Sequence, residues 1–373
     1  MKNEIIKVAF VGGGINSAVG YAHYSAINMD NGFELVAGCF SRNKDINYAS
    51  AEKYRVSADR VYNNLDELIR EERDRIDAVI ILTPQNQHYS HVLKFISEGV
   101  PVICEKSLAA SVEEVVEIKK AVERKSGFLS VIYNYLGYPV IRELKHLINN
   151  GDLGKIIHVQ IEMPQEGFIR VNDKNKPVVP QKWRLNDGSI PTISLDLGVH
   201  LHMLVKYLVN EHPIKLIAIS ESLGNFSTVV DNVNCIIKYS NDIVCNLWYS
   251  KIAIGSRNGM KIRVFGNKGS AEWTQEFPEV LKLADRKGRR WTLDRGNNEV
   301  DICNQQRYNR FKVGHPAGYI EALANYYCDI AYAMKNGSVK SENHFGVDEA
   351  YEGILLMNAI QKSTQLNTWM EVK

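Results

Sequence analysis

Hydrophobic positions follow two different periods along the first 135 residues. Runs of consecutive apolar residues, such as 77–82 and 102–104, alternate with segments such as 111–125, where apolar residues recur every three or four positions. Continuous apolar runs are typical of parallel strands buried on both faces, and the longer recurrence is typical of amphipathic helices. The pattern therefore predicts a doubly wound parallel α/β sheet over residues 1–135.

The pattern changes after residue 136. A helix is expected near 139–150, and short strands joined by tight turns follow it, with no long helix between most of them. We expect these strands at 156–163, 214–220, 233–239, 243–249, 260–265, 271–275 and 280–285, followed by helices at 317–334 and 347–364. Residues 136–373 are thus predicted to form an α+β domain with a large, mostly antiparallel open sheet.

Composition narrows the choice of partner and compartment. The chain has 373 residues, 45% of them apolar, and a net charge of +2 from 45 basic and 43 acidic side chains. This length supports two cores, and so balanced a charge argues against a nucleic-acid or membrane partner and for a small molecule. Six cysteines lack C-x-x-C spacing, and no apolar run approaches the ~18 residues of a membrane span. We expect a cytoplasmic protein.

A glycine turn links the first predicted strand to the first helix. Residues 5–11 are mostly apolar, and Gly12, Gly13 and Gly14 follow directly, with Asn16 and Ser17 next. Such a turn lets the backbone approach a ligand while the helix that follows directs N–H groups at it, as in a pyrophosphate site. Ser17 takes the third position of G-x-G-x-x-G, where a small residue permits close packing. The alternative is a tight connection without a ligand.

The second predicted strand, at 33–40, ends in Ser41 and Arg42. An acidic residue at this point would bind the adenosine ribose and favour NAD, whereas a small polar residue followed by arginine suits a 2′-phosphate. The cofactor is therefore expected to be NAD(P), with NADP favoured. The alternative is that Arg42 is only a solvated surface residue.

Polar residues follow two further strands. Thr83 and Pro84 come after the strand at 77–82, and Lys106 follows the strand at 102–104. Ligands of doubly wound sheets bind outside the carboxyl ends of the strands, so these residues are expected to face the cofactor.

Another candidate for chemistry is the predicted helix at 195–208. Asp196 and His200 lie four positions apart, so they share a helix face, and a carboxylate beside an imidazole raises its basicity. The alternative is a local pair that only caps a helix. Histidines 88, 91, 200 and 202 lack further ligands at zinc spacing, and no metal is expected.

These motifs together resemble the Gfo/Idh/MocA oxidoreductase family. The matching pieces, in order, are the glycine turn, Thr83-Pro84-x-x-x-His88, Glu105-Lys106, Tyr138-Pro139 with Gly154, Trp183-Arg184, Asp196-x-Gly198-x-His200, and 315–319 with the sequence HPAGY. The resemblance implies an N-terminal Rossmann domain and a C-terminal α/β domain with an open sheet that pairs between subunits. We therefore expect a homodimer or homotetramer.

The resemblance also implies residue roles. Lys106 would contact the nicotinamide ribose and the substrate hydroxyl, His200 would be the general base, and Asp196 its supporting carboxylate. Cofactor contacts are expected from the glycine turn with residues 16 and 17, from 41–42, 83–84, His88, Glu105 and Lys106. Substrate contacts are expected from Tyr135, Arg184 and Tyr319. Two residues depart from the family pattern, Ser107 in place of a proline after the lysine and Met203 in place of a second aspartate.

The function that follows is an NAD(P)-dependent dehydrogenase. It would move a hydride between nicotinamide and a ring hydroxyl or keto group of a sugar, nucleotide-sugar or cyclitol. Two alternatives remain open, an NAD-dependent glycosidase that works by transient oxidation and a dinucleotide-binding regulator without catalysis.

Overall fold

The computed structural model describes residues 5–336 and 343–373. The chain forms two compact units, each described by itself below. Unit 1 comprises Met1–Gly137 and Tyr319–Tyr351, and unit 2 comprises Tyr138–Gly318 and Glu352–Lys373.

Unit 1 is built on a five-stranded sheet in the order β2-β1-β3-β4-β5, and every neighbouring pair is parallel. Strand β3 is buried along its whole length, as its continuous apolar sequence predicts. The doubly wound parallel sheet is thereby confirmed. The strands are β1 (Ile6–Gly12), β2 (Phe33–Cys39), β3 (Ala78–Leu82), β4 (Val102–Glu105) and β5 (Leu129–Ile132).

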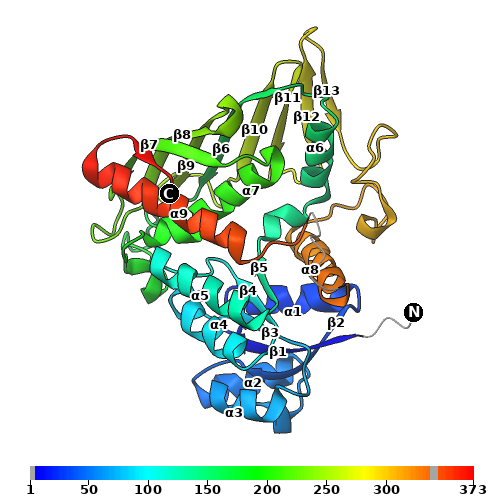
Figure 1. Ribbon diagram of the computed structural model, residues 1–373, viewed down its shortest axis with the longest axis vertical. Coiled ribbons are helices and arrows are strands. Elements are labelled where there is room, and N and C mark those ends of the chain that lie inside the picture. Colours follow the sequence, from blue (N-terminus) through cyan, green and yellow to red (C-terminus); the bar gives the residue numbers. More distant parts are fainter. Residues whose placement is uncertain (1–4, 337–342) are drawn as a thin grey trace. The chain divides into compact units, whose positions relative to one another are not determined.

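Helices flank this sheet on both sides. Figure 1 shows α4 and α5 together on one flank, and α1 with α8 on the other. Polar side chains cap several helices: Asn43, Asn64 and Ser111 accept hydrogen bonds from the first turns of α2, α3 and α5. The helices are α1 (Gly20–Met29), α2 (Lys44–Lys53), α3 (Leu65–Glu72), α4 (His88–Ser97), α5 (Val112–Lys125) and α8 (Tyr319–Lys335).

The division of the chain differs from the predicted boundary at 135/136 in one respect. Helix α8 and the segment after it lie far along the sequence but belong to unit 1. The Tyr326 hydroxyl donates to the Val131 carbonyl at 2.7 Å, and the Val131 N–H donates to the Phe345 carbonyl at 2.9 Å. These hydrogen bonds attach the late segment to the last strand of the parallel sheet.

Unit 2 is built on a nine-stranded sheet in the order β13-β12-β11-β10-β6-β9-β8-β7-β14. All neighbours are antiparallel except β6 and β9, so the predicted mostly antiparallel sheet is confirmed. The sequence did not predict β13 or β14. The strands are β6 (Ile156–Pro164), β7 (Pro213–Glu221), β8 (Asn232–Tyr239), β9 (Val244–Ser250), β10 (Lys261–Gly266), β11 (Gly269–Thr274), β12 (Leu281–Asp285), β13 (Arg290–Leu293) and β14 (Met370–Glu371).

Helices cover one face of this sheet. Burial alternates along β8, which is the pattern of a sheet with one packed face and one open face. The covering helices are α6 (Pro139–Asn149), α7 (Val199–Val209) and α9 (Val347–Leu366), seen beside the sheet in Figure 1. In the described part of the chain, no helix has the length and apolar character needed to cross a bilayer.

Candidate active site

The glycine turn of unit 1 has the backbone of a ligand cradle. Gly12 and Gly13 have φ of +78° and +71°, a region that side chains disfavour. A Cβ on Gly12 would lie 2.8 Å from the Thr83 Cγ2, and one on Gly20 only 1.9 Å from the Gly13 carbonyl oxygen. The close packing of helix on turn therefore depends on Gly20 and not on Ser17, whose Oγ instead accepts from the N–H groups of residues 19 and 20. This bare backbone at the start of a helix fits a dinucleotide pyrophosphate.

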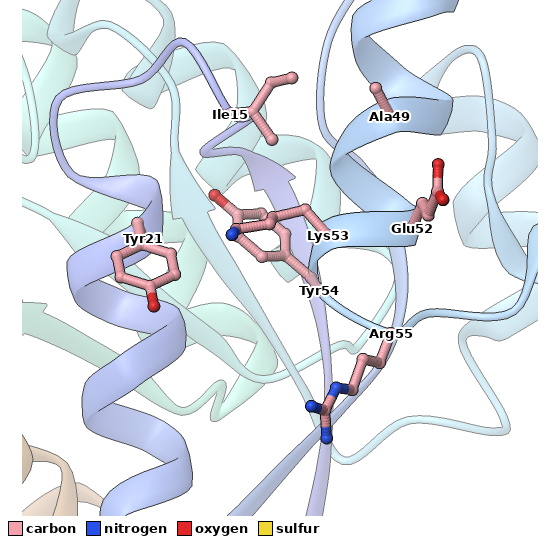
Figure 2. A pocket seen from close by; sticks show the side chains of 7 residues that line it. All are labelled: Ile15, Tyr21, Ala49, Glu52, Lys53, Tyr54 and Arg55. Carbon is pink, nitrogen blue, oxygen red and sulfur yellow. The ribbon is translucent and has the colours of Figure 1, made fainter.

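Ser50 of α2 and Tyr54, the residue that follows the helix, contact the turn. The Tyr54 hydroxyl donates to the Gly13 carbonyl at 2.9 Å, and the Ser50 Oγ accepts from the Ile15 N–H at 3.0 Å. Tyr54 also forms one wall of an open pocket of about 940 Å³ between α1 and α2, in which Lys53 lies over the ring of Tyr21. Figure 2 shows the pocket with its lining residues, Ile15, Tyr21, Ala49, Glu52, Lys53, Tyr54 and Arg55. Tyr54 thus connects this pocket with the turn.

The end of β2 is held by one buried amide. Asn47 Oδ1 accepts from the N–H groups of Phe40 and Ser41, at 2.7 and 3.3 Å. Arg42 follows and is exposed. The Arg42 charge acts on His91: burial, and then the charges of residues 88, 94 and 42, lower the pKa of His91 to about 4. His91 in turn lies near the end of β3, with its Nδ1 3.2 Å from the Thr83 hydroxyl.

His88 joins the ends of β3 and β4. Its Nε2 lies 2.7 Å from the Thr83 carbonyl oxygen and its Nδ1 lies 2.7 Å from the Ser107 carbonyl oxygen. Burial lowers the pKa of His88, although these two carbonyls oppose the shift. Ser107 is buried and its Oγ donates to the Ala109 carbonyl, so the residue that replaces the family's proline is held by hydrogen bonds. The Lys106–Ser107 peptide is cis.

Glu105 and Lys106 lie at the same sheet edge as the glycine turn, because β1 and β4 are parallel members of one sheet. One Glu105 oxygen accepts from the Lys106 N–H at 3.2 Å, and the other lies 3.0 Å from Nε2 of the buried His23. Burial alone would raise the pKa of the Glu105 carboxyl, but His23 and Lys106 outweigh it and hold that pKa below its usual value.

In unit 2, two cations bind one predicted carboxylate. Lys251 Nζ lies 2.6 Å from Asp196 Oδ2, and Arg184 Nη1 donates to the same oxygen. Asp196 and Lys251 are buried, and Lys251 lies over the Phe168 ring. The structure thus brings together two residues predicted from sequence, Asp196 and Arg184, and adds Lys251, which the sequence did not indicate.

His200 follows Asp196 on a continuous helical segment, where a π turn at Ser194–Gly198 leads into α7. A Cβ on Gly198 would lie 2.5 Å from the Met357 sulfur, so a larger residue here would require the Met357 side chain to shift. Met203, which replaces the family's second aspartate, is buried in the core. Of the remaining predicted substrate residues, Tyr135 is buried and Tyr319 is partly exposed at the start of α8.

Comparison with known proteins follows this geometry. A model described as "Oxidoreductase family, NAD-binding Rossmann fold" matches residues 6–133, and its partner, the family's C-terminal alpha/beta domain, matches residues 145–372. The chain belongs to the Gfo/Idh/MocA oxidoreductase family. It is an NAD(P)-dependent oxidoreductase.

Relatives match this Gfo/Idh/MocA oxidoreductase over most of its length. It is 30% identical to an uncharacterized oxidoreductase, YfiI, of Bacillus subtilis, across 99% of this chain and 97% of that protein. Glucose-6-phosphate 3-dehydrogenase of the same bacterium is 28% identical, across 75% of this chain and 77% of the enzyme. An inositol dehydrogenase homolog from Azotobacter vinelandii, crystallised with NADH and myo-inositol, has a TM-score of 0.89 and 27% identity, with 99% of this chain and 98% of that chain covered.

Proposed function

We propose that the protein is a dehydrogenase of a polyhydroxylated ring, a sugar, nucleotide-sugar or cyclitol, and that it moves a hydride between nicotinamide and a ring hydroxyl or keto group. The observation that carries this proposal is the position of Lys106 at the carboxyl edge of the sheet that bears the glycine turn. Relatives named for glucose 6-phosphate and for inositol support the substrate class.

A bound nicotinamide supplies the hydride acceptor or donor. The glycine turn and the ends of β2, β3 and β4 hold the dinucleotide. His200 accepts the proton of the substrate hydroxyl during oxidation and returns it during reduction. Lys106 stabilises the negative charge that develops on that oxygen. Asp196, fixed by Lys251 and Arg184, supports the acid–base group from the preceding helical turn.

Two substitutions test these roles. Lys106→Ala and His200→Ala are expected to lower kcat on the active polyol by about 10²- to 10⁴-fold, because each removes a group that acts on the reacting oxygen. The Kd for NAD(P)H, measured by fluorescence titration, is expected to stay within about twofold, since the turn that holds the pyrophosphate is unchanged. Lys125→Ala, at the exposed end of α5, is the control. Unchanged turnover in both variants contradicts the proposal.

We also propose NADP as the preferred cofactor. Arg42 is exposed at the end of β2, near His91 and hence near the end of β3, which suits a 2′-phosphate. Arg42→Ala is expected to raise the Kd for NADPH by about tenfold and leave that for NADH unchanged. Arg124→Ala, on the far end of α5, controls for the loss of one positive charge. Tighter binding of NADH than NADPH by the wild type contradicts this assignment.

The open face of the nine-stranded sheet supports a proposed homodimer or homotetramer. Ile236 on β8 and Phe265 on β10 lie on this face, and they are 44% and 37% exposed. Ile236→Asp is expected to shift the mass in light scattering toward the monomer, because it places a charge among apolar contacts. A monomeric wild type at micromolar concentration contradicts the proposal.

The described cysteines are all free, in accord with the expected cytoplasmic location.

A further inference from the structure

Two buried side chains of unit 1, Tyr327 and His23, and the partly buried Glu105 form a chain of contacts that ends at the backbone of Lys106. The Tyr327 hydroxyl on α8 lies 2.7 Å from His23 Nδ1 on α1. His23 Nε2 lies 3.0 Å from Glu105 Oε1, at ion-pair distance but without a hydrogen bond, and Glu105 Oε2 accepts from the Lys106 N–H. His23 is fully buried and Tyr327 is 2% exposed.

The protonation states of Tyr327 and Glu105 limit which group can donate a hydrogen bond at each contact. Burial, and then the charge of Glu105, raise the pKa of Tyr327 well above its ordinary value, so the phenol keeps its proton. The phenol can then donate to His23 Nδ1 in the tautomer that carries its N–H on Nε2, the nitrogen next to the Glu105 carboxylate. Glu105, whose pKa is lowered, accepts this contact as an anion. The phenol, imidazole, carboxylate and peptide N–H therefore follow one another at distances of 2.7, 3.0 and 3.2 Å.

A second buried histidine holds the other side of the same segment. His88 lies against the carbonyl oxygen of Ser107, directly after Lys106, and against that of Thr83. The backbone at Lys106 is therefore held at its N–H by Glu105 and at the next carbonyl by His88. Anchoring of the backbone limits the positions that the long, flexible Lys106 side chain can reach with its ammonium group.

We infer that Tyr327 and His23 are positioning residues for Lys106: they fix the Glu105 carboxylate, which fixes the backbone N–H of the lysine. The inference rests on the proposed catalytic role of Lys106. It assigns helix α8 an indirect contribution to catalysis, in which Tyr327 acts through His23 and Glu105 and does not touch the substrate.

A merely structural role for the same residues is the competing explanation, and unit 1 contains a matched control. The Tyr62 hydroxyl donates to the buried Glu72 carboxylate at 2.7 Å, and Arg60 pairs with that carboxylate. Tyr62→Phe and Tyr327→Phe each remove one hydroxyl from a buried carboxylate network. Only the second network reaches Lys106.

The experiment measures amide hydrogen exchange at residues 105–107, together with kcat and the Kd for NADPH, in the full-length protein. Tyr327→Phe is expected to speed exchange at the Lys106 amide by about fivefold or more and to lower kcat by about fivefold, the effect of one lost hydrogen bond. The Kd for NADPH is expected to stay unchanged. Tyr62→Phe is expected to leave exchange at 105–107 and kcat unchanged.

His23→Gln, alone and combined with Tyr327→Phe, completes the test. The double variant is expected to lose no more than His23→Gln alone, because both act through Glu105. Unchanged exchange at 105–107 in Tyr327→Phe overturns the inference, as does faster exchange with unchanged kcat. If the wild type turns over no polyol, the proposed function fails, and the exchange measurement still decides whether Tyr327 holds the Lys106 backbone.

Discussion

The two units hold their functional groups by different means. In unit 1, the cradle is shaped by missing side chains, since Gly12 and Gly20 leave space that a single Cβ would fill. In unit 2, the site is shaped by charge, since Asp196 is buried against Lys251 and Arg184. The first arrangement is sensitive to added volume, and the second is sensitive to lost charge. Substitutions that change only one of these quantities therefore separate the two.

The largest loss of stability is expected at Gly20, where an added methyl group has the least space. Gly20→Ala places a Cβ 1.9 Å from the Gly13 carbonyl oxygen, so the helix must move off the turn. We expect the free energy of unfolding to fall by about 3 kcal/mol and NAD(P)H binding to be lost. Denaturant titration and fluorescence titration measure these changes. Gly167→Ala, where nothing lies within 4 Å, is the control and should be nearly neutral. Retained nucleotide binding in Gly20→Ala would contradict the conclusion that the cradle depends on the missing side chain at Gly20.

A change of charge at nearly constant volume comes next. Lys251→Met keeps a side chain of similar length but removes the ammonium group that lies 2.6 Å from Asp196, while the ion pair of Asp196 with Arg184 remains. We expect the free energy of unfolding to fall by about 2 kcal/mol, less than for a fully broken buried pair. Lys261→Met, which breaks a more exposed pair with Glu272, should cost below about 1 kcal/mol. Equal losses of unfolding free energy in the two variants would show that the buried ion pair of Asp196 stabilises unit 2 no more than the more exposed pair of Glu272.

The smallest effect concerns pH. Contacts with His202, His212 and Lys206 outweigh burial and lower the pKa of Glu352 from 4.5 to about 2. Because the folded pKa is depressed, this carboxylate stabilises the protein above pH 4.5, and the contribution is lost as the pH falls from 4.5 toward 2. We expect a loss of about 1 kcal/mol, after screening by solvent around the exposed His212. Glu352→Gln should flatten this part of the stability profile, and an unchanged slope would contradict the assignment.

Local features of the fold could be predicted from the sequence because they depend on neighbouring residues. The segment 111–125 was expected to be an amphipathic helix, and α5 begins there, with the Ser111 Oγ accepting from the Glu114 N–H. Glu114 in turn accepts from the Ala110 N–H. The seven predicted strands of unit 2 all formed. Strands β13 and β14 were missed because they are short and mostly polar or exposed.

Features that depend on distant contacts could not be predicted. The role of Gly20 depends on where the helix meets the Gly13 carbonyl, and the short-motif spacing pointed instead to Ser17. Lys251 follows β9 and meets Asp196 only because that strand packs beside the helical segment. The assignment of α8 to unit 1 depends likewise on tertiary packing. Glycines near a predicted turn, and lysines within apolar strand ends, were the available signals.

The return of α8 to unit 1 sets an order for biosynthesis. The ribosome releases Met1–Gly137 early, but the helix that carries Tyr326 and Tyr327 emerges only after Tyr138–Gly318 has been translated. Until then, the Val131 carbonyl and His23 lack their partners from α8. The nucleotide-binding unit is therefore still incomplete when translation of Tyr138–Gly318 ends, an interval in which incompletely folded chains are prone to aggregate.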